Sequence, residues 1–181
     1  MLPSFKEQII MKHFNYLFIL VGLFSCQEVD KNNNVINPQQ IKEALIDANK
    51  VAAEQESLQI DGFVSRRKLD VITTGTGLRY QIYFKGDGKK AEPGMKAVIS
   101  YEMSLIDGRV IYSTKEVGVE EFTIGNDRVE SGLHEGICYM NVGDKAKIII
   151  PSHLAHGLVG DFKKIPVRST VIYDIELKGL K

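Results

Sequence analysis

The apolar residues of the chain follow a helical period in its first part and a strand period in its second part. Near the start of the pattern, apolar side chains recur at steps of three and four: Ile41, Ala44, Leu45, Ala48, Val51 and Ala52. This spacing predicts an amphipathic helix of about 18 residues, which Pro38 is suited to begin. Residues 58–71 continue the pattern more weakly. An apolar stripe of this length must be buried, either against the rest of the chain or in a homodimer through residues 39–57.

From residue 78 onward the pattern alternates with a period of two, which is typical of half-buried strands. In the first strand, the residues expected to face inward are Leu78, Tyr80, Ile82 and Phe84. A longer strand leads to an Asp107-Gly108 hairpin, and its inward face comprises Ala97, Ile99, Tyr101, Met103 and Leu105. Further strands are predicted at 109–113, 122–124, 145–150 and 170–177, with a short helix within 129–140. Several antiparallel strands around one short helix describe an α+β fold.

The N-terminal residues have the features of an export signal. Met11-Lys12-His13 is a basic start, and residues 14–24 form an apolar run that is far shorter than the roughly 20 residues of a membrane-spanning helix. The run ends in Leu23-Phe24-Ser25-Cys26, which looks like a bacterial lipobox. We therefore expect a lipoprotein signal peptide at 1–25, lipid on Cys26 and a polar tether at 26–38. An uncleaved anchor and an ordinary secretion signal are the alternatives.

These boundaries leave a helical segment at 39–72 and a folded domain at 73–181. The 181 residues carry 23 basic and 23 acidic side chains. A balanced charge gives no electrostatic reason to expect a nucleic acid as partner. The expected membrane contact is the lipid anchor alone, which would place the protein in a bacterial cell envelope, at the outer membrane or the periplasmic face.

The motifs of the usual enzyme classes are not supported by the sequence. His134 and Glu135 begin a pattern like that of zinc proteases, but Cys138 stands where the second histidine is required. Gly75-Thr76-Gly77 lacks the third glycine of a dinucleotide-binding fingerprint, because Tyr80 occupies that position. We therefore expect neither a metal nor a cofactor.

A series of short motifs extends over residues 94–181. In order they are Asp107-Gly108, Val129, Gly132-Leu133-His134-Glu135-Gly136, Val142-Gly143-Asp144-Lys145-Ala146, Ala155-His156-Gly157, Ile165-Pro166 and Tyr173-Asp174-Ile175-Glu176-Leu177. In this order and spacing the chain resembles the FKBP-type peptidyl-prolyl cis-trans isomerases. The resemblance implies an antiparallel sheet wrapped around one short helix. It also implies an activity that speeds rotation about X-Pro bonds without a nucleophile, metal or cofactor.

The resemblance further implies where a proline would bind. Tyr101 and Val129 match pocket walls, Tyr173 matches an aromatic back wall, and Ile165 matches an aliphatic residue at the rim. Other positions depart from the family pattern. Leu133 stands where the family has a Trp at the pocket floor, and Ile111 stands in place of a pocket Phe. Tyr112 replaces an Asp that orders the site, and His156 replaces a Tyr that bonds the ligand carbonyl. Glu120 and Glu130 lie where apolar contacts are expected.

These matches assign expected roles to ten positions. Catalytic roles are expected for Tyr101, Tyr112, His156 and Tyr173, and substrate contacts for Ile111, Phe122, Val129, Glu130, Leu133 and Ile165. His156 can still donate a hydrogen bond, and its protonation near neutral pH would make activity pH-dependent. A loop histidine satisfied by solvent is the alternative for this residue.

A narrower resemblance concerns the lipid-anchored, gliding-motility-associated branch of the family. It rests on Thr74-Gly75-Thr76-Gly77-Leu78-Arg79-Tyr80, Ile111-Tyr112-Ser113, Leu133-His134-Glu135-Gly136, Pro151-Ser152-His153-Leu154-Ala155 and Asp161 ahead of Lys164-Ile165-Pro166. It implies an envelope isomerase that acts on proline-containing segments of exported proteins. The departures in the pocket favour an alternative, a catalytically weak binding or chaperone-like lipoprotein with the same fold.

Overall fold

The computed structural model describes residues 37–181. The chain divides after Lys42 into two units, and the fold described below is that of the second unit, Glu43–Lys181. Its first helix begins a few residues earlier, at Pro38. The expected signal peptide, Cys26 and the tether as far as residue 36 lie outside the described residues. Within residues 37–181, no helix combines the length and the apolar character needed to cross a membrane.

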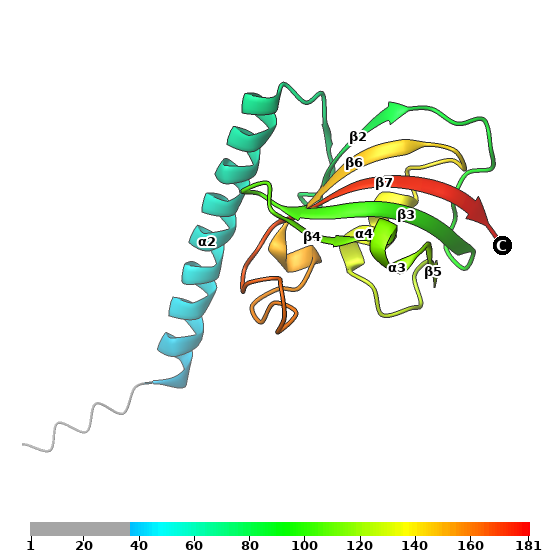
Figure 1. The fold of residues 1–181 in the computed structure, drawn as a ribbon. Helices are drawn as coiled ribbons and strands as arrows, with labels where there is room; N and C mark the ends of the chain where they lie inside the picture. Colours follow the sequence, from blue (N-terminus) through cyan, green and yellow to red (C-terminus); the bar gives the residue numbers. More distant parts are fainter. Residues whose placement is uncertain (1–36) are drawn as a thin grey trace, which may run out of the picture. The chain divides into compact units, whose positions relative to one another are not determined.

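Antiparallel pairing joins all the strands of the described chain into one sheet of seven strands. The strands are β1 (Ile72–Thr73), β2 (Arg79–Phe84), β3 (Lys96–Leu105), β4 (Val110–Ser113), β5 (Glu120–Thr123), β6 (Lys145–Ile150) and β7 (Val171–Leu180). Their spatial order is β1-β2-β6-β7-β3-β4, and β5 pairs with β3 (Figure 1). The strand that comes last in the sequence therefore lies in the middle of the sheet.

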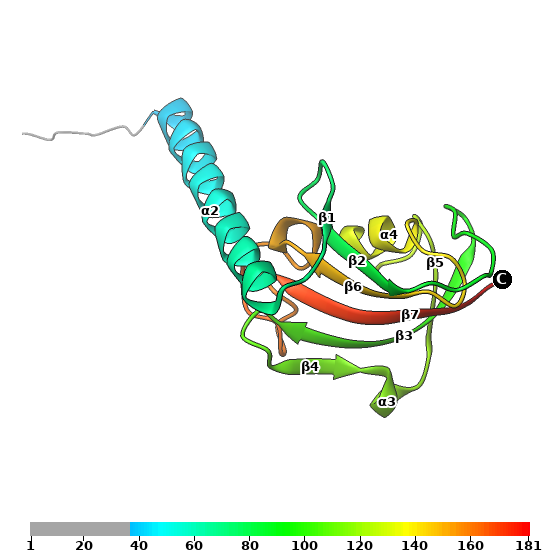
Figure 2. The same cartoon turned by 90° about the horizontal axis from the view of Figure 1, so that it is seen from above.

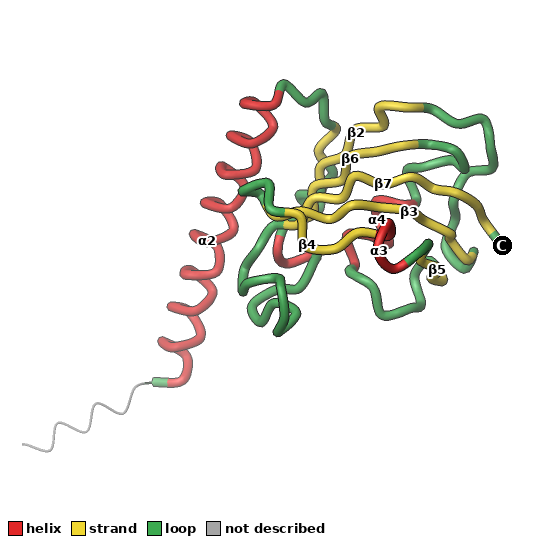
Figure 3. The backbone as a smooth tube through the Cα atoms, viewed as in Figure 1, coloured by secondary structure: helices red, strands yellow, loops and turns green. Residues whose placement is uncertain are grey.

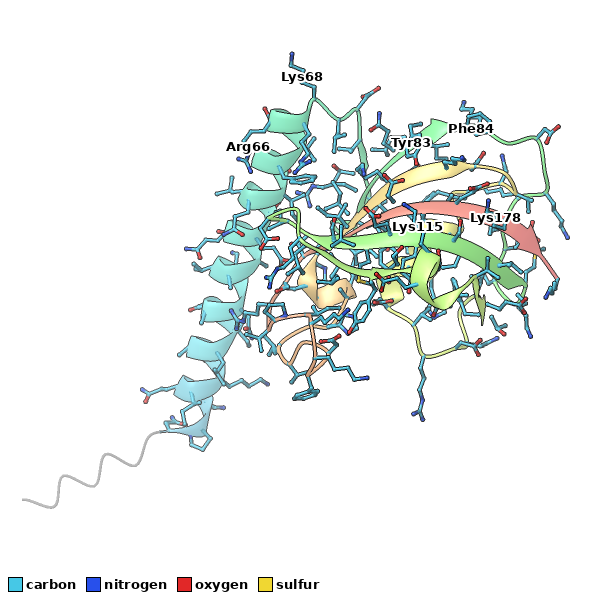
Figure 4. The ribbon with its side chains drawn as sticks, viewed as in Figure 1. Arg66, Lys68, Tyr83, Phe84, Lys115 and Lys178 are labelled. Atoms are coloured by element: carbon cyan, nitrogen blue, oxygen red, sulfur yellow. The ribbon has the colours of Figure 1, made fainter. Side chains whose placement is uncertain are left out.

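The longest pairing joins β3 to β7, from Ala97 opposite Leu180 to Leu105 opposite Val171. The alternation predicted for residues 97–105 is confirmed, since Ala97, Ile99, Met103 and Leu105 are buried. The inward position predicted for Phe84 is wrong, because the pairing of β2 with β6 shifts register just before it. Phe84 is 55% exposed at the end of β2, beside the exposed Tyr83 (Figure 4).

The short helix α4 (Ser131–Ile137) lies against one face of the sheet (Figure 2). Two of its glycines make this approach possible, because side chains of β6 occupy the space where their Cβ atoms would be. A Cβ on Gly132 would lie 2.3 Å from Cγ2 of Ile150, and one on Gly136 would lie 2.8 Å from Cδ1 of Ile148. The helix within 129–140 is thus confirmed, in a shorter form than its apolar pattern indicated.

Both faces of the sheet are covered, since successive side chains of a strand point to opposite sides. On the α4 side, Ile148 and Ile150 belong to the main hydrophobic core. On the other side, Ile149 and Ile172 form a second core with Ile60 and Phe63 of the helix α2 (Pro38–Arg67). The α2 residues Glu43 to Arg67 therefore include a part that packs on the sheet.

Helix α2 is longer than the helix of about 18 residues predicted from the stripe, and it ends at Arg67, within the helical segment expected at 39–72. Its buried part differs from the predicted one. Its 30 residues include the weaker pattern after residue 58, which supplies the buried Ile60 and Phe63. The strong stripe at 41–52 is not buried against the domain, because Leu45 is 59% exposed and Val51 is 52% exposed. Of the two alternatives for the stripe, packing on the domain is excluded for Leu45 and Val51 within the described residues.

Two short helical turns complete the fold. They are α3 (Thr114–Val117), which follows β4, and the 3-10 turn η1 (Ser152–Leu154), which follows β6. Apart from η1, the connection from Pro151 to Thr170 between β6 and β7 consists of turns and loop (Figure 3). We refer to residues 151–170 as the β6–β7 connection.

Candidate active site

A cavity of about 560 Å³ lies between α4, the sheet and the β6–β7 connection. Its walls come from β3, β4, β5 and β7, from α4 and the residues just before it, and from the connection. They comprise Tyr101, Met103, Tyr112, Glu120, Arg128, Val129, Glu130, Leu133, Ala155, His156, Asp161, Lys163 and Tyr173. The cavity thus combines an aromatic and aliphatic base with several charged groups.

Tyr101 and Tyr173 form the aromatic part of this cavity. Tyr173 stands opposite Met103 in the β3–β7 pairing, so Tyr101 lies two residues along on the same face of the sheet. Their ring centroids are 5.1 Å apart and their planes meet at 61°, an edge-to-face arrangement that aromatic rings favour. Tyr173 is only 2% exposed, whereas Tyr101 is partly open to the cavity.

Glu130 collects two donors on one carboxylate oxygen. Its Oε1 lies 2.8 Å from Nε2 of His156 and accepts a hydrogen bond of 3.1 Å from the hydroxyl of Tyr173. Because a carboxylate can only accept, Nε2 of His156 carries its hydrogen toward Glu130. Glu130 also precedes α4, but its side chain makes no capping bond there. Burial and the neighbouring Glu130 carboxylate raise the pKa of Tyr173 well above its ordinary value.

Glu120 engages the other tyrosine. The hydroxyl of Tyr101 donates to its Oε2 at 2.8 Å. Burial and this bond raise the pKa of Tyr101 above its ordinary range, so both tyrosines stay protonated at neutral pH. The two phenol hydroxyls and the histidine nitrogen are therefore already paired with carboxylates.

Tyr112 and Asp161 form a further pair at the edge of the cavity. The hydroxyl of Tyr112 donates to Oδ2 of Asp161. Oδ1 of the same carboxylate accepts from the backbone amides of Lys163, Lys164 and Ile165 at 2.7 to 2.9 Å. Partial burial disfavours the ionised form of Asp161, but these four donors outweigh it and hold its pKa below the usual range.

The cavity lining does not point to covalent catalysis by a serine, threonine or cysteine nucleophile. Its lining, taken from residues 37–181, includes no serine, threonine or cysteine. Nor do three or more His, Cys, Asp or Glu side chains gather as a possible metal site anywhere in that range. What the site does offer is a surface for an apolar ring, with hydrogen-bonding groups around it.

The comparisons with known proteins agree with this geometry. The sequence profile of the family described as FKBP-type peptidyl-prolyl cis-trans isomerase matches residues 87–178. The FKBP-type peptidyl-prolyl cis-trans isomerase FkpA of Escherichia coli (strain K12) is 31% identical over 161 residues, which are 87% of this chain and 58% of that protein. This chain belongs to the FKBP-type peptidyl-prolyl cis-trans isomerase family.

Other FKBP-type proteins match shorter regions. FK506-binding protein 2 of Yarrowia lipolytica (strain CLIB 122 / E 150) is 41% identical over 93 residues, covering 51% of this chain and 65% of that protein. The chain thus spans less than two thirds of the length of both relatives.

Solved structures show the same architecture. The crystal structure of FkpA from Escherichia coli matches with a TM-score of 0.63 and 28% identity, covering 99% of this chain and 84% of that one. The crystal structure of AtFKBP13 matches with a TM-score of 0.59 and 29% identity, covering 62% and 99% respectively. The expected FKBP fold, an antiparallel sheet around a short helix with a helix before it, is confirmed.

Most of the residues that the FKBP resemblance assigned to the site meet around the cavity. Those that line it are Tyr101, Tyr112, Val129, Glu130, Leu133, His156 and Tyr173. Ile111, Phe122 and Ile165 do not line it, and all three are at least 95% buried within the main core. Ile165 is therefore not the rim residue that was expected; its amide is instead tied to Asp161. His156 is bonded to Glu130 and is not a histidine satisfied by solvent.

Several lining residues were not assigned to the site from the sequence. Met103 follows Tyr101 by two positions, so the strand alternation could have identified it. Asp161 was noted only as part of a motif, and its bond to Tyr112 joins residues that are 49 apart in sequence. Ala155 precedes His156 in one of the family motifs, which could have identified it. Arg128 and Lys163 lie on connections without a periodic pattern, which leaves no signal that would have placed them.

Proposed function

We propose that this FKBP-type protein is a peptidyl-prolyl cis-trans isomerase that binds the twisted X-Pro amide in the cavity lined by Tyr101, Val129, Leu133 and Tyr173. The observation that carries the proposal is the meeting of these four side chains around one hollow on an FKBP fold. Proline rings are apolar and compact, and such a hollow offers them aromatic and aliphatic contacts. The reaction needs neither a cofactor nor a metal.

The energetics of the reaction suit a cavity that acts by binding alone, because no covalent bond has to form. An X-Pro bond rotates over a barrier of about 18–20 kcal/mol, because amide resonance must be broken. The half-rotated amide has lost charge separation, so an apolar, water-poor cavity disfavours it less than it disfavours the planar forms. Binding the twisted form more tightly by about 1.36 kcal/mol gives a tenfold increase in rate.

The polar groups around the cavity would orient the rotating peptide. The hydroxyl of Tyr112 and the ring of His156 lie at its edge, where a client carbonyl would need a donor. Each must first loosen a bond to Asp161 or Glu130. Catalysis is therefore expected to be weaker than in a cavity whose donors have no carboxylate partner.

The rate of cis-trans exchange in an Xaa-Pro peptide, measured by exchange NMR, tests the proposal. Val129→Ser should lower kcat/KM about tenfold, because it removes roughly 1.5 kcal/mol of apolar contact. The matched control is Val119→Ser, since Val119 is 60% exposed and lies outside the cavity lining. A wild-type rate no higher than that of buffer would reject the proposed activity.

A second candidate function is a catalytically weak binding or chaperone-like module with the same fold. It is favoured by the pairing of both tyrosine hydroxyls and His156 with Glu120 and Glu130. Suppression of client aggregation that persists in the Val129→Ser variant would support this function. Loss of that suppression on replacing both Tyr101 and Tyr173 with alanine would instead tie it to the isomerase cavity.

We also propose that lipid on Cys26 anchors the protein in a bacterial cell envelope, at the outer membrane or the periplasmic face. The support is the sequence Leu23-Phe24-Ser25-Cys26 after a short apolar run. Cys26→Ser should release the protein from the membrane fraction of its host cells. Continued membrane residence of that variant would contradict the lipid anchor.

The clients would then be proline-containing segments of exported or envelope proteins. Membership of the lipid-anchored, gliding-motility-associated branch is a further part of this proposal, supported by the motifs at 74–80, 111–113 and 151–155. Deletion of the protein should slow gliding in a motile host. Normal gliding in the deletion strain would contradict a role of this protein in gliding motility.

A homodimer through residues 39–57 is the last part of the proposal. Leu45 and Val51 are more than half exposed, although their spacing is that of an apolar stripe. Leu45→Glu with Val51→Glu should halve the mass found by analytical ultracentrifugation. Gln55→Glu on the same helix is the control, and a wild-type protein that is already monomeric would end the idea.

A further inference from the structure

The β6–β7 connection carries one side of the candidate active site and is attached to the rest of the domain at its two ends as well as through Asp161 and Ile165. Ala155, His156, Asp161 and Lys163 of this connection line the cavity. It begins next to Ser152 and ends at Thr170, both of which are buried, with exposures of 8% and 5%. How these two ends are fixed therefore contributes to where the cavity residues lie.

A single carboxylate from helix α2 holds both ends. Glu56 accepts from the amide of Ser152 at 2.8 Å and from the hydroxyl of Thr170 at 2.6 Å, both through Oε1. Its Oε2 accepts from the hydroxyl of Ser152 at 2.8 Å. Hydrogen bonds to an ionised acceptor are about twice as strong as those between neutral groups. Glu56 thus closes the connection into a loop at its base.

The position of Glu56 is itself fixed by the next turns of α2. Ile60 and Phe63 pack on the sheet with Ile149 and Ile172. The guanidinium of Arg79, which is nearly buried, donates to Ser57 at 2.7 Å and to Asp61 at 2.8 Å. The carboxylate of Glu56 therefore projects from a helix that is firmly attached to the domain at this point.

Close packing does not replace the Glu56 contacts. A cavity of about 700 Å³ separates this part of α2 from the connection, and Glu56, Ser152 and Arg168 are among the residues around it. The other polar link is exposed, a bond of 2.8 Å from Arg168 to Asn49. Glu56 therefore makes the less exposed part of the attachment, through bonds that are partly buried.

Ser152 transmits this attachment to His156. The carbonyl oxygen of Ser152 accepts from the amides of Ala155 at 3.1 Å and Gly157 at 2.8 Å, the two residues that flank His156. His156 in turn contacts Glu130 across the cavity. A continuous series of hydrogen bonds therefore runs from Glu56 through Ser152 and the turn at 155–157 to the candidate active site.

We propose that Glu56 is a positioning residue for this site: it binds Ser152 and Thr170 and so sets the place of His156 relative to Glu130. The proposal rests on the proposed isomerase function for its effect on rate, but not for its effect on structure. Helix α2 thereby helps to position active-site residues, although it precedes the catalytic domain in the sequence.

The first test does not depend on activity. In isotopically labelled protein, Glu56→Gln should shift the amide NMR signals of Ala155, His156 and Gly157, because the amide side chain cannot accept all three bonds. Glu54→Gln is the matched control, since Glu54 is an exposed acid on the same helix. Unchanged signals for 155–157 in a folded Glu56→Gln protein would overturn the proposal, even if the protein proves to have no isomerase activity.

The second test separates positioning from general destabilisation. Glu56→Gln should lower kcat/KM on the order of tenfold, since small misplacements of active-site groups have large effects on rate. In a His156→Ala background the same change should have little further effect, because the two residues act in series. Equal losses in both backgrounds would contradict the role assigned to Glu56.

Should Glu56→Gln fail to fold, the single variants Ser152→Ala and Thr170→Val remove its partners one at a time. Each variant removes one side-chain hydrogen bond to Glu56 and leaves its carboxylate bonded to the remaining donors. Signals of 155–157 that move in Ser152→Ala support the proposal. Signals that stay in place in both variants overturn it.

Discussion

Tyr112 of β4 donates its hydroxyl hydrogen to Asp161, which lies on the β6–β7 connection 49 positions later in the chain. The FKBP resemblance places Tyr112 where other members carry an Asp that orders the site. In this protein the carboxylate comes from the β6–β7 connection, and the tyrosine reaches it. The same carboxylate accepts the amides of three residues that follow it, so it orders the connection as well as the cavity edge.

Breaking this pair should loosen the connection. We expect Tyr112→Phe to lower the free energy of unfolding by about 1 kcal/mol, the usual net value of one hydrogen bond. Asp161→Asn should cost about as much, because the group is partly exposed. Urea unfolding of both variants and of the double variant measures their coupling. Strictly additive losses would show that the two side chains do not interact in solution.

Because the pKa of Asp161 is lowered in the folded protein, the stabilisation that its carboxylate provides should depend on pH. A carboxyl group whose pKa falls on folding stabilises the protein above its unfolded pKa of about 3.9, and the contribution is lost as the pH drops toward the folded value. The difference in stability between wild type and Asp161→Asn should therefore be constant from neutral pH to about pH 5 and shrink in more acidic solution. A difference that grows on acidification would contradict the assignment.

Glu130 should be needed mainly because Tyr173 is buried. Glu130→Leu removes the acceptor of a hydroxyl in a residue that is 2% exposed, and an unpaired buried donor costs about 1–3 kcal/mol. Adding Tyr173→Phe removes that donor, so the double variant should regain much of the loss in urea unfolding. It should also be at least as active as Glu130→Leu in the peptide assay. A double variant that is less stable than either single one would show that Glu130 acts otherwise.

The two cavity tyrosines should resist ionisation while the protein is folded. Burial, first, and the carboxylates of Glu120 and Glu130 raise the pKa of Tyr101 and Tyr173. A tyrosine whose pKa rises on folding stabilises the protein below its unfolded pKa of about 10, and this contribution is lost as the pH rises above that value. Alkaline titration followed by phenolate absorbance and circular dichroism should show their ionisation together with unfolding. Tyr173→Phe should reduce the absorbance change that accompanies unfolding. Phenolate formation while the circular dichroism is still that of the folded protein would contradict the raised pKa of these tyrosines.

Gly132 should tolerate no side chain. Gly132→Ala would gain up to about 1 kcal/mol of helix propensity, but its Cβ would meet Ile150 at 2.3 Å, and overpacking of a core costs about 1–3 kcal/mol. Net destabilisation is therefore expected, with lower activity because α4 also carries Leu133. Gly179→Ala is the control, since nothing lies within 4 Å of its added Cβ. Thermal unfolding would contradict the prediction if Gly132→Ala were as stable as the wild type.

Local pattern was sufficient to find the strands and much of the site. The alternation at 97–105 correctly placed Ala97, Ile99, Met103 and Leu105 in the core. The family motifs brought Tyr101, Val129, Leu133 and Tyr173 to one cavity. In these cases each residue's environment follows from its own strand or helix.

Contacts between distant segments could not be predicted from the sequence pattern. Glu56 and Ser152 are 96 residues apart, and neither stands out in a helical or strand pattern. The stripe at 41–52 has a stronger periodicity than residues 58–67, yet Ile60 and Phe63 are the α2 residues that pack. Periodicity shows that a face can be buried, whereas the partner depends on how the remaining chain folds.

The central place of β7 has a consequence for the order of events during synthesis. Strands β6 and β3 are neighbours only through β7, which follows both of them in the sequence. Until residues 171–180 have left the ribosome, the two halves of the sheet have no strand to join them, and Ile148 and Ile99 stay open to solvent. The sheet can therefore be completed only after this strand emerges, so the domain is expected to finish folding late.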